Sequence, residues 1–191
     1  DGRVLSATEK SEPQAAGVSM FDVGLNATRH AQLVRWCGLT AEQHDLVEPM
    51  RALLVDPNLD AIVASFYERV GAHRETMAII GDPNRLRALE RTQREYLCSL
   101  GRGFDQPEYY ERRLRIGIAH ARVGLSSSLF QLSAGWLRDA VIDSVPPARW
   151  LEARPLIKLL DALMRLDVAI ALEAYHHRRI DALRASVRTL E

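Results

Sequence analysis

Residues 113–125 read Arg113-Leu-Arg-Ile-Gly-Ile-Ala-His120-Ala-Arg-Val-Gly-Leu125 and place one histidine inside a strongly helical pattern. Ile116 precedes His120 by one turn and Val123 follows it by almost one turn, which predicts a common helix face. Gly117 lies on the same side, although a glycine within a helix costs about 1 kcal/mol relative to alanine. A flat, rigid ligand would explain it, because the backbone could then approach that ligand closely. The pattern fits an axial haem ligand, and it also fits an ordinary core histidine.

Composition and charge argue against several classes of protein. The chain has 191 residues with 25 basic and 25 acidic side chains, so its formal net charge at pH 7 is zero. We therefore expect no binding to nucleic acid or to an anionic membrane. No apolar run approaches the roughly 20 residues that span a bilayer, and the N-terminus lacks the apolar core of a signal peptide. Cys37 and Cys98 stand alone, which favours reduced thiols in a cytoplasmic protein over a disulfide or a zinc site.

Helical periodicity extends over almost the whole chain, and no run of alternating β-branched residues predicts a sheet. Capping residues, prolines and glycines at the ends of the apolar patterns predict about eight helices. We expect them at about residues 26–37, 40–56, 58–70, 74–80, 83–100, 107–123, 128–143 and from 149 to the C-terminus. The sequence therefore predicts an all-α fold.

The two ends of the chain differ in character from its middle. Residues 1–20 are rich in Ser, Glu, Ala and Gly without a sustained apolar period, so we expect a flexible tail there and the folded domain at 21–178. Beyond it, four apolar residues follow the spacing of a heptad seam: Ile180, Leu183, Val187 and Leu190. Residues 179–191 thus look like the start of a helical linker in a parallel dimer. Because the chain begins with Asp rather than Met, we expect it to be part of a longer protein.

A set of motifs between residues 96 and 125 carries more specific information. They are Tyr96-Leu97, Gly103-Phe104-Asp105, Tyr109-Tyr110, Arg115-Ile116-Gly117, His120 and Val123-Gly124-Leu125. Together they resemble the globin-coupled sensors, which are bacterial sensory globins related to protoglobin, over about residues 25–180. The resemblance implies a globin fold, a three-over-three-like helical sandwich around haem b, with an extra N-terminal helix and a long C-terminal helix. It identifies His120 as the iron ligand and Tyr67 as the distal tyrosine.

The resemblance also assigns the distal side of the haem to the helix at about 83–100. Leu86 and Leu89 would exclude water, and Thr92 or Gln93 would offer a second polar contact to the bound gas. The residues expected to contact haem are Tyr67, Leu86, Leu89, Thr92, Gln93, Tyr96, Ile116, Gly117, His120 and Val123. No histidine lies between His73 and His120, so we expect iron with an open sixth position. The other histidines are expected to be exposed or partly buried: His30, His44, His73, His176 and His177.

One position departs from the family pattern. Many relatives carry a tyrosine ten residues after the proximal histidine, whereas this chain has Phe130. The proximal pocket therefore lacks one hydroxyl that could form a hydrogen bond near the iron ligand. Ser126, Ser127 or a backbone carbonyl near Ile116 could orient the imidazole instead, and the sequence leaves these alternatives open.

The resemblance implies a haem-based gas sensor domain, with O₂ as the expected ligand and NO or CO as alternatives. The last two helices would pair in a homodimer and pass ligation to a covalently linked output domain, such as a diguanylate cyclase, a histidine kinase or a chemotaxis-type module. The residues present contain no catalytic module, so we expect no enzyme activity from them.

Three other functions compete with this interpretation. A haem enzyme that processes O₂ or NO would need a distal acid and base, for which Tyr67 with Thr92 or Gln93 is a poor pair. A haem-free dimerisation module could use His120 or His176 as a phosphoacceptor, but Ala121 and Arg122 follow His120 where an acidic residue is usual. A haem-free helical sensor on the globin scaffold would have no reason to keep both His120 and Tyr67.

Overall fold

The computed structural model describes residues 27–188 and, within them, the side chains of residues 27–176. The predicted tail at 1–20 and Leu190 lie outside this range, and so do the side chains of the seam at Ile180, Leu183 and Val187. The described part contains eight α-helices, three short 3₁₀ helices and no strand, in agreement with the all-α prediction. The α-helices are α1 (Ala27–Trp36), α2 (His44–Leu54), α3 (Leu59–Gly71), α4 (Arg74–Ile80), α5 (Pro83–Cys98), α6 (Pro107–Arg122), α7 (Ser127–Asp143) and α8 (Trp150–Arg188).

Local signals in the sequence set most helix ends. The Asp82 carboxylate accepts hydrogen bonds from the backbone N–H groups of Asn84 and Arg85 at 2.8 and 3.0 Å, and Pro83 occupies the first turn of α5. The Ser126 hydroxyl accepts a bond from the backbone N–H of Leu129 at 3.2 Å and caps α7. Gly124 between α6 and α7 has φ +83°, a conformation that glycine adopts without strain.

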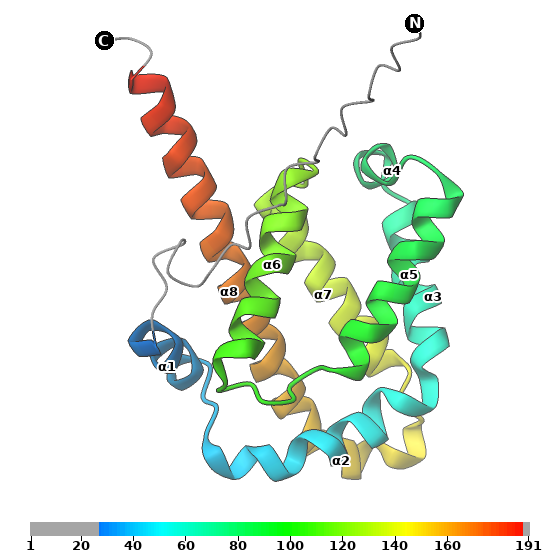
Figure 1. The fold of residues 1–191 in the computed structure, drawn as a ribbon. Coiled ribbons are helices and arrows are strands. Elements are labelled where there is room, and N and C mark those ends of the chain that lie inside the picture. The colour runs from blue at the N-terminus through cyan, green and yellow to red at the C-terminus, as the bar shows by residue number, and fades with distance from the viewer. Residues whose placement is uncertain (1–26, 189–191) are drawn as a thin grey trace, which may run out of the picture.

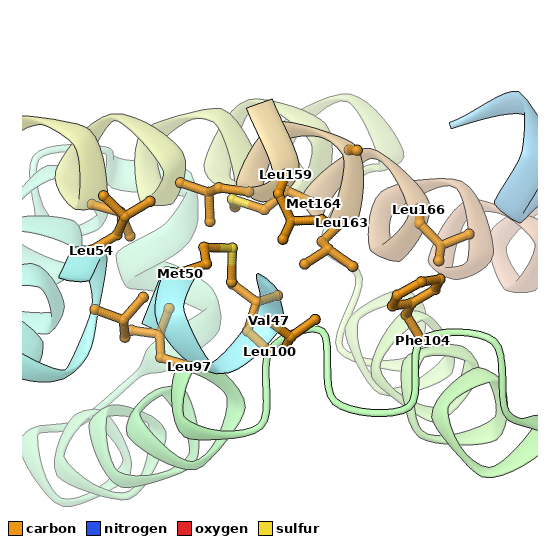
Figure 2. Packing of buried hydrophobic residues seen from close by; sticks show 14 of the residues in the cluster. Val47, Met50, Leu54, Leu97, Leu100, Phe104, Leu159, Leu163, Met164 and Leu166 are labelled. Atoms are coloured by element: carbon orange, nitrogen blue, oxygen red, sulfur yellow. The ribbon is translucent and has the colours of Figure 1, made fainter. Parts of the chain in front are cut away.

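The helices enclose one core, to which buried residues from Leu33 to Ala174 contribute. In Figure 1, α2 runs across one end of the molecule, α3 and α5 stand side by side, and α8 leads from the core towards the C-terminus. Figure 2 shows Val47 and Met50 of α2 packed with Leu159 and Leu163 of α8. Phe104, in the connection between α5 and α6, is 1% exposed in the same cluster. The first half of α8 is therefore a core helix.

Helices α6 and α8 approach each other closely at Gly117. A Cβ atom on Gly117 would lie 2.3 Å from the carbonyl oxygen of Ala171 and 2.7 Å from its Cα, both on α8. These distances are shorter than real Cβ contacts, so only glycine allows α6 and α8 to meet at this point. The glycine thus accommodates a neighbouring helix, and our explanation of it through a flat ligand is wrong.

His30 docks α1 onto the core and is 4% exposed, so its expected exposure is also wrong. The ring lies 3.9 Å from that of Tyr110, and Nε2 is 3.2 Å from the carbonyl oxygen of Phe104. Because a carbonyl only accepts, Nε2 carries the proton and donates it. Burial lowers the pKa of His30 below the ordinary value of 6.5, and the carbonyl and Asp105 oppose that shift in part.

Acid should destabilise the protein in part through His30. Since its pKa is lower in the folded state, the unfolded chain binds more protons below pH 6.5. The contribution is complete above pH 6.5 and is lost as the pH falls towards the folded-state pKa. We expect His30→Gln to flatten the dependence of the free energy of unfolding on pH between 7 and 5 in urea titrations. An unchanged slope in His30→Gln would contradict the assignment.

The structure also bears on two expectations from the sequence, the lack of a membrane-spanning segment and the reduced state of the cysteines. Among the described residues, no helix combines the length and apolarity that crossing a membrane requires. Cys37 and Cys98 are half-buried and do not form a disulfide, as their isolation in the sequence indicates.

Candidate functional site

A cavity of about 140 Å³ lies among five helices, α3, α5, α6, α7 and α8. Its lining is mostly apolar, with a few polar groups among the apolar side chains, as is typical of sites for small organic ligands. Phe66 reaches it from α3, Phe130 and Leu137 from α7, and Met164 from α8. Figure 1 shows two of these helices, α5 and α6, standing apart with α7 between them. Of the ten residues expected to contact a ligand, the cavity brings together Thr92, Gln93, Tyr96, Ile116 and His120.

His120 is held in one tautomer by its own helix. Its Nδ1 lies 2.8 Å from the carbonyl oxygen of Ile116, and because that oxygen only accepts, Nδ1 carries the proton. The neutral ring then keeps a lone pair on Nε2. Burial lowers the pKa of His120, while the bond to Ile116 opposes this shift, so the ring stays neutral at physiological pH. This is the state in which imidazole binds a metal.

Phe130 covers one side of the His120 ring. The two ring centroids lie 5.1 Å apart at 60°, and Phe130 in turn lies 5.8 Å from the ring of Tyr175 on α8. Of the three candidates for orienting His120, the structure places the Ile116 carbonyl at the imidazole. The Ser126 hydroxyl is already bound to the backbone of Leu129 as a helix cap.

Tyr67 lies behind the wall of the cavity and does not line it. Its ring packs edge-to-face against Phe66, with centroids 5.0 Å apart at 77°, and Phe66 forms the wall. Burial and the nearby charge of Glu90 raise the pKa of Tyr67 well above its ordinary value. The phenol therefore keeps its proton and remains a hydrogen-bond donor at any physiological pH.

Four further expected ligand contacts lie elsewhere. Leu86 and Leu89 are half-buried on α5 but outside the cavity lining. Gly117 faces α8, as described above. Val123 is 43% exposed, because α6 ends at Arg122 and the chain turns away at Gly124, so it does not continue the face of His120. Thr92 does line the cavity, but its hydroxyl donates to the carbonyl of Ala88 at 3.2 Å.

A buried ionic cluster at the cavity was missed by the sequence reasoning. Asp167 of α8 accepts bonds from the Tyr96 hydroxyl at 2.7 Å, the Tyr109 hydroxyl at 2.5 Å and Arg113 Nε at 2.9 Å. Two signals could have revealed it. Arg113 stands seven residues, or two turns, before His120 on the same helix face. Asp167 is a charged residue among the apolar residues Leu163, Leu166 and Ile170.

Comparison with known proteins shows the family to which this chain is related. The family model for Protoglobin matches residues 26–180 of this chain. A curated relative, the heme-based aerotactic transducer HemAT of Halobacterium salinarum, is 31% identical over 135 residues. That match covers 64% of this chain and 27% of HemAT, so the chain corresponds to about a quarter of that relative. The predicted globin fold is thereby confirmed, with α1 as the additional N-terminal helix and α8 as the long C-terminal one. The resemblance noted in the sequence is also confirmed, and the chain belongs to the protoglobin family.

Proposed function

We propose that this chain is a haem-based gas sensor domain, in which His120 Nε2 binds the iron of haem b. The hydrogen bond from Nδ1 of His120 to the Ile116 carbonyl carries the proposal, since it directs the lone pair to Nε2 at the wall of a largely apolar cavity. Membership of the protoglobin family and the name of the matched relative, a heme-based transducer, support it. His120 is the one histidine among the described residues that line the cavity, in keeping with an open sixth position.

The residues of the cavity fit a haem. They provide a neutral imidazole, apolar side chains for a porphyrin face and a buried cationic group at Arg113. When bound, the haem supplies an iron with one position open to a diatomic gas, which we expect to be O₂ and alternatively NO or CO. Phe66 and Phe130 exclude water. Tyr67, still protonated, would donate a hydrogen bond to the gas after its ring rotates past Phe66.

The proposal extends to the partners of the domain. We expect a homodimer through α7 and α8, which expose Leu132 at 58% and Leu151 at 87%. Ligation would bias the arrangement of these helices and so control a covalently linked output domain. HemAT is an aerotactic transducer by name, but it shares only a quarter of its length with this chain. The output domain, the cytoplasmic location and the lack of enzyme activity all stay predictions.

Visible absorption spectra test the role of His120. We expect purified protein to show a Soret band that shifts on reduction and again when the ferrous protein meets air. His120→Ala should lose or displace this band, because the cavity then offers no nitrogen ligand to iron. His73 provides a matched control, since it lies outside the cavity, stacked on Trp136 at 4.7 Å. His73→Ala should keep the wild-type spectrum. A colourless protein that takes up no added haem would exclude the proposal.

The spectra also separate a sensor from a haem enzyme. A sensor should hold its gas in a stable complex, whereas an enzyme that processes O₂ or NO should consume it with turnover. We expect a spectrum that persists in air without consumption of added reductant beyond slow oxidation.

A further inference from the structure

Arg113 carries an unused hydrogen-bond donor at the wall of the cavity. Its side chain is 3% exposed and that of its partner Asp167 is 8% exposed. Nε of Arg113 donates to Asp167 Oδ2 at 2.9 Å, but Nη2 is buried and has no hydrogen-bond partner among the described residues. A buried donor without an acceptor is costly, and more so when it belongs to a charged group. The hydrogen bonding of the Arg113 guanidinium is therefore incomplete.

The surroundings of Arg113 hold the guanidinium in place. Its Cζ lies over two aromatic rings, 4.7 Å from the centroid of Tyr96 and 4.3 Å from that of Tyr109. Both tyrosine hydroxyls donate to Asp167, so the carboxylate accepts three bonds in total. Asp167 is thus occupied on both oxygens, and the rings fix the direction of the arginine fork. The remaining nitrogen, Nη2, belongs to a side chain that lines the cavity, and it is held ready for one further acceptor.

The chemistry of the missing acceptor follows from the donor. A buried guanidinium with one free donor favours an anionic acceptor, and a carboxylate oxygen is such an acceptor. Arg113, Tyr96 and His120 line the same cavity. Arg113 precedes His120 by seven residues on one face of α6, which is a rise of about 10.5 Å along the helix.

We propose that Arg113 forms an anion subsite of the His120 cavity and holds a propionate carboxylate of the bound haem. The inference rests on the proposed function, because it needs a haem in this cavity. Asp167, Tyr96 and Tyr109 position Arg113 and do not themselves bind the carboxylate. Thr92 and Gln93 are uncharged, which leaves Arg113 as the one basic residue among the described residues of the lining besides His120.

Two porphyrins that differ only in their carboxylates test the subsite. Apoprotein is titrated with haem and with haem dimethyl ester, in which both propionates are esterified, and binding is followed by the Soret band. We expect wild-type protein to bind haem at least about tenfold more tightly than the ester, the effect of one charge-assisted hydrogen bond. Equal affinities would overturn the inference. If neither porphyrin binds, the proposed function itself fails.

Variants assign the preference to Arg113. Arg113→Met should reduce the ratio of the two affinities towards one, provided that circular dichroism shows a folded protein. Arg115→Met is the matched control, since Arg115 is exposed on the same helix and pairs with Glu111 at 3.2 Å. It should keep the wild-type ratio. If Arg113→Met retains the full preference for haem, another group holds the propionates and the inference is wrong.

Two further experiments complete the test. One uses a variant that should fold normally, and the other distinguishes a haem propionate from a free carboxylate. Arg113→Lys keeps a positive charge beside Asp167 but loses the planar fork, so it should fold and show an intermediate ratio. Sodium formate, added to wild-type protein, tests whether the subsite takes a free carboxylate. Formate that tightens binding of the ester, together with equal affinities for haem and ester without it, would assign the subsite to a free anion and overturn the propionate inference.

Discussion

Replacing Gly117 with alanine should destabilise the protein by about 3 kcal/mol, and replacing it with valine should cost more. The new Cβ would lie 2.3 Å from the Ala171 carbonyl oxygen and 2.9 Å from the carbonyl carbon, and both of these are backbone atoms. A flexible side chain could rotate away from such a contact, but the backbone of a helix cannot. The helices α6 and α8 would have to separate, and the surrounding packing would loosen. Thermal unfolding should show a decrease in Tm of roughly 10 °C for a domain of this size.

Gly135 is the matched control for this prediction. It also lies inside a helix, α7, and a Cβ built there meets nothing within 4 Å. Gly135→Ala should therefore stabilise the protein by about 0.5 to 1 kcal/mol, through higher helix propensity and a less flexible unfolded chain. If Gly117→Ala unfolded at the same temperature as the wild type, α6 and α8 could not be in the contact described.

Replacing Asp167 with alanine should cost about 3 to 5 kcal/mol. The substitution leaves the Arg113 charge buried without its counterion and removes the acceptor of the Tyr96 and Tyr109 hydroxyls. Burying an unpaired charge and two donors without acceptors costs more free energy than the intact pair contributes. The loss of stability therefore exceeds that from breaking an ordinary salt bridge. Urea titrations at pH 7 should give this difference in the free energy of unfolding.

A surface pair and a double substitution make this prediction specific. Asp60 pairs with Arg94 at 2.8 Å but its side chain is 86% exposed, so Asp60→Ala should change stability by less than about 1 kcal/mol. Arg113→Met combined with Asp167→Ala should be less harmful than Asp167→Ala alone, because no charge is then left buried. Equal losses in Asp60→Ala and Asp167→Ala would show that the buried cluster contributes nothing special.

The sequence predicted the structural features that depend on residues close together along the chain. Asp82 with Pro83, Ser126 and Gly124 mark helix ends through local hydrogen bonds and backbone conformation, and the observed ends differ from the expected ones by a residue or two at most such places. The tautomer of His120 depends on the carbonyl of Ile116, four residues away on the same helix, and this carbonyl was among the alternatives. Periodicity and short-range chemistry are sufficient for features of this kind.

The sequence did not predict contacts between helices that are distant along the chain. Asp167 meets Tyr96 across 71 residues, and nothing local to either residue reveals the pairing. Gly117 was explained through a ligand because its true neighbour, Ala171, belongs to a helix whose register against α6 is set only by packing of the whole core. Val123 was assigned to a face that the end of α6 interrupts. Tertiary packing decides such positions.

The contact of Gly117 with Ala171 has a mechanical consequence. Most helix pairs are separated by side chains, whose rotamers can change and so absorb small displacements of one helix. At Gly117, three residues from His120, no side chain separates the helices, and the backbone of α6 contacts the backbone of α8. A shift of α6 at His120 is therefore not absorbed by side chains at this contact and must move α8, the long C-terminal helix. The contact between α6 and α8 is rigid beside His120, so even a displacement of α6 by a fraction of an ångström is passed on to α8.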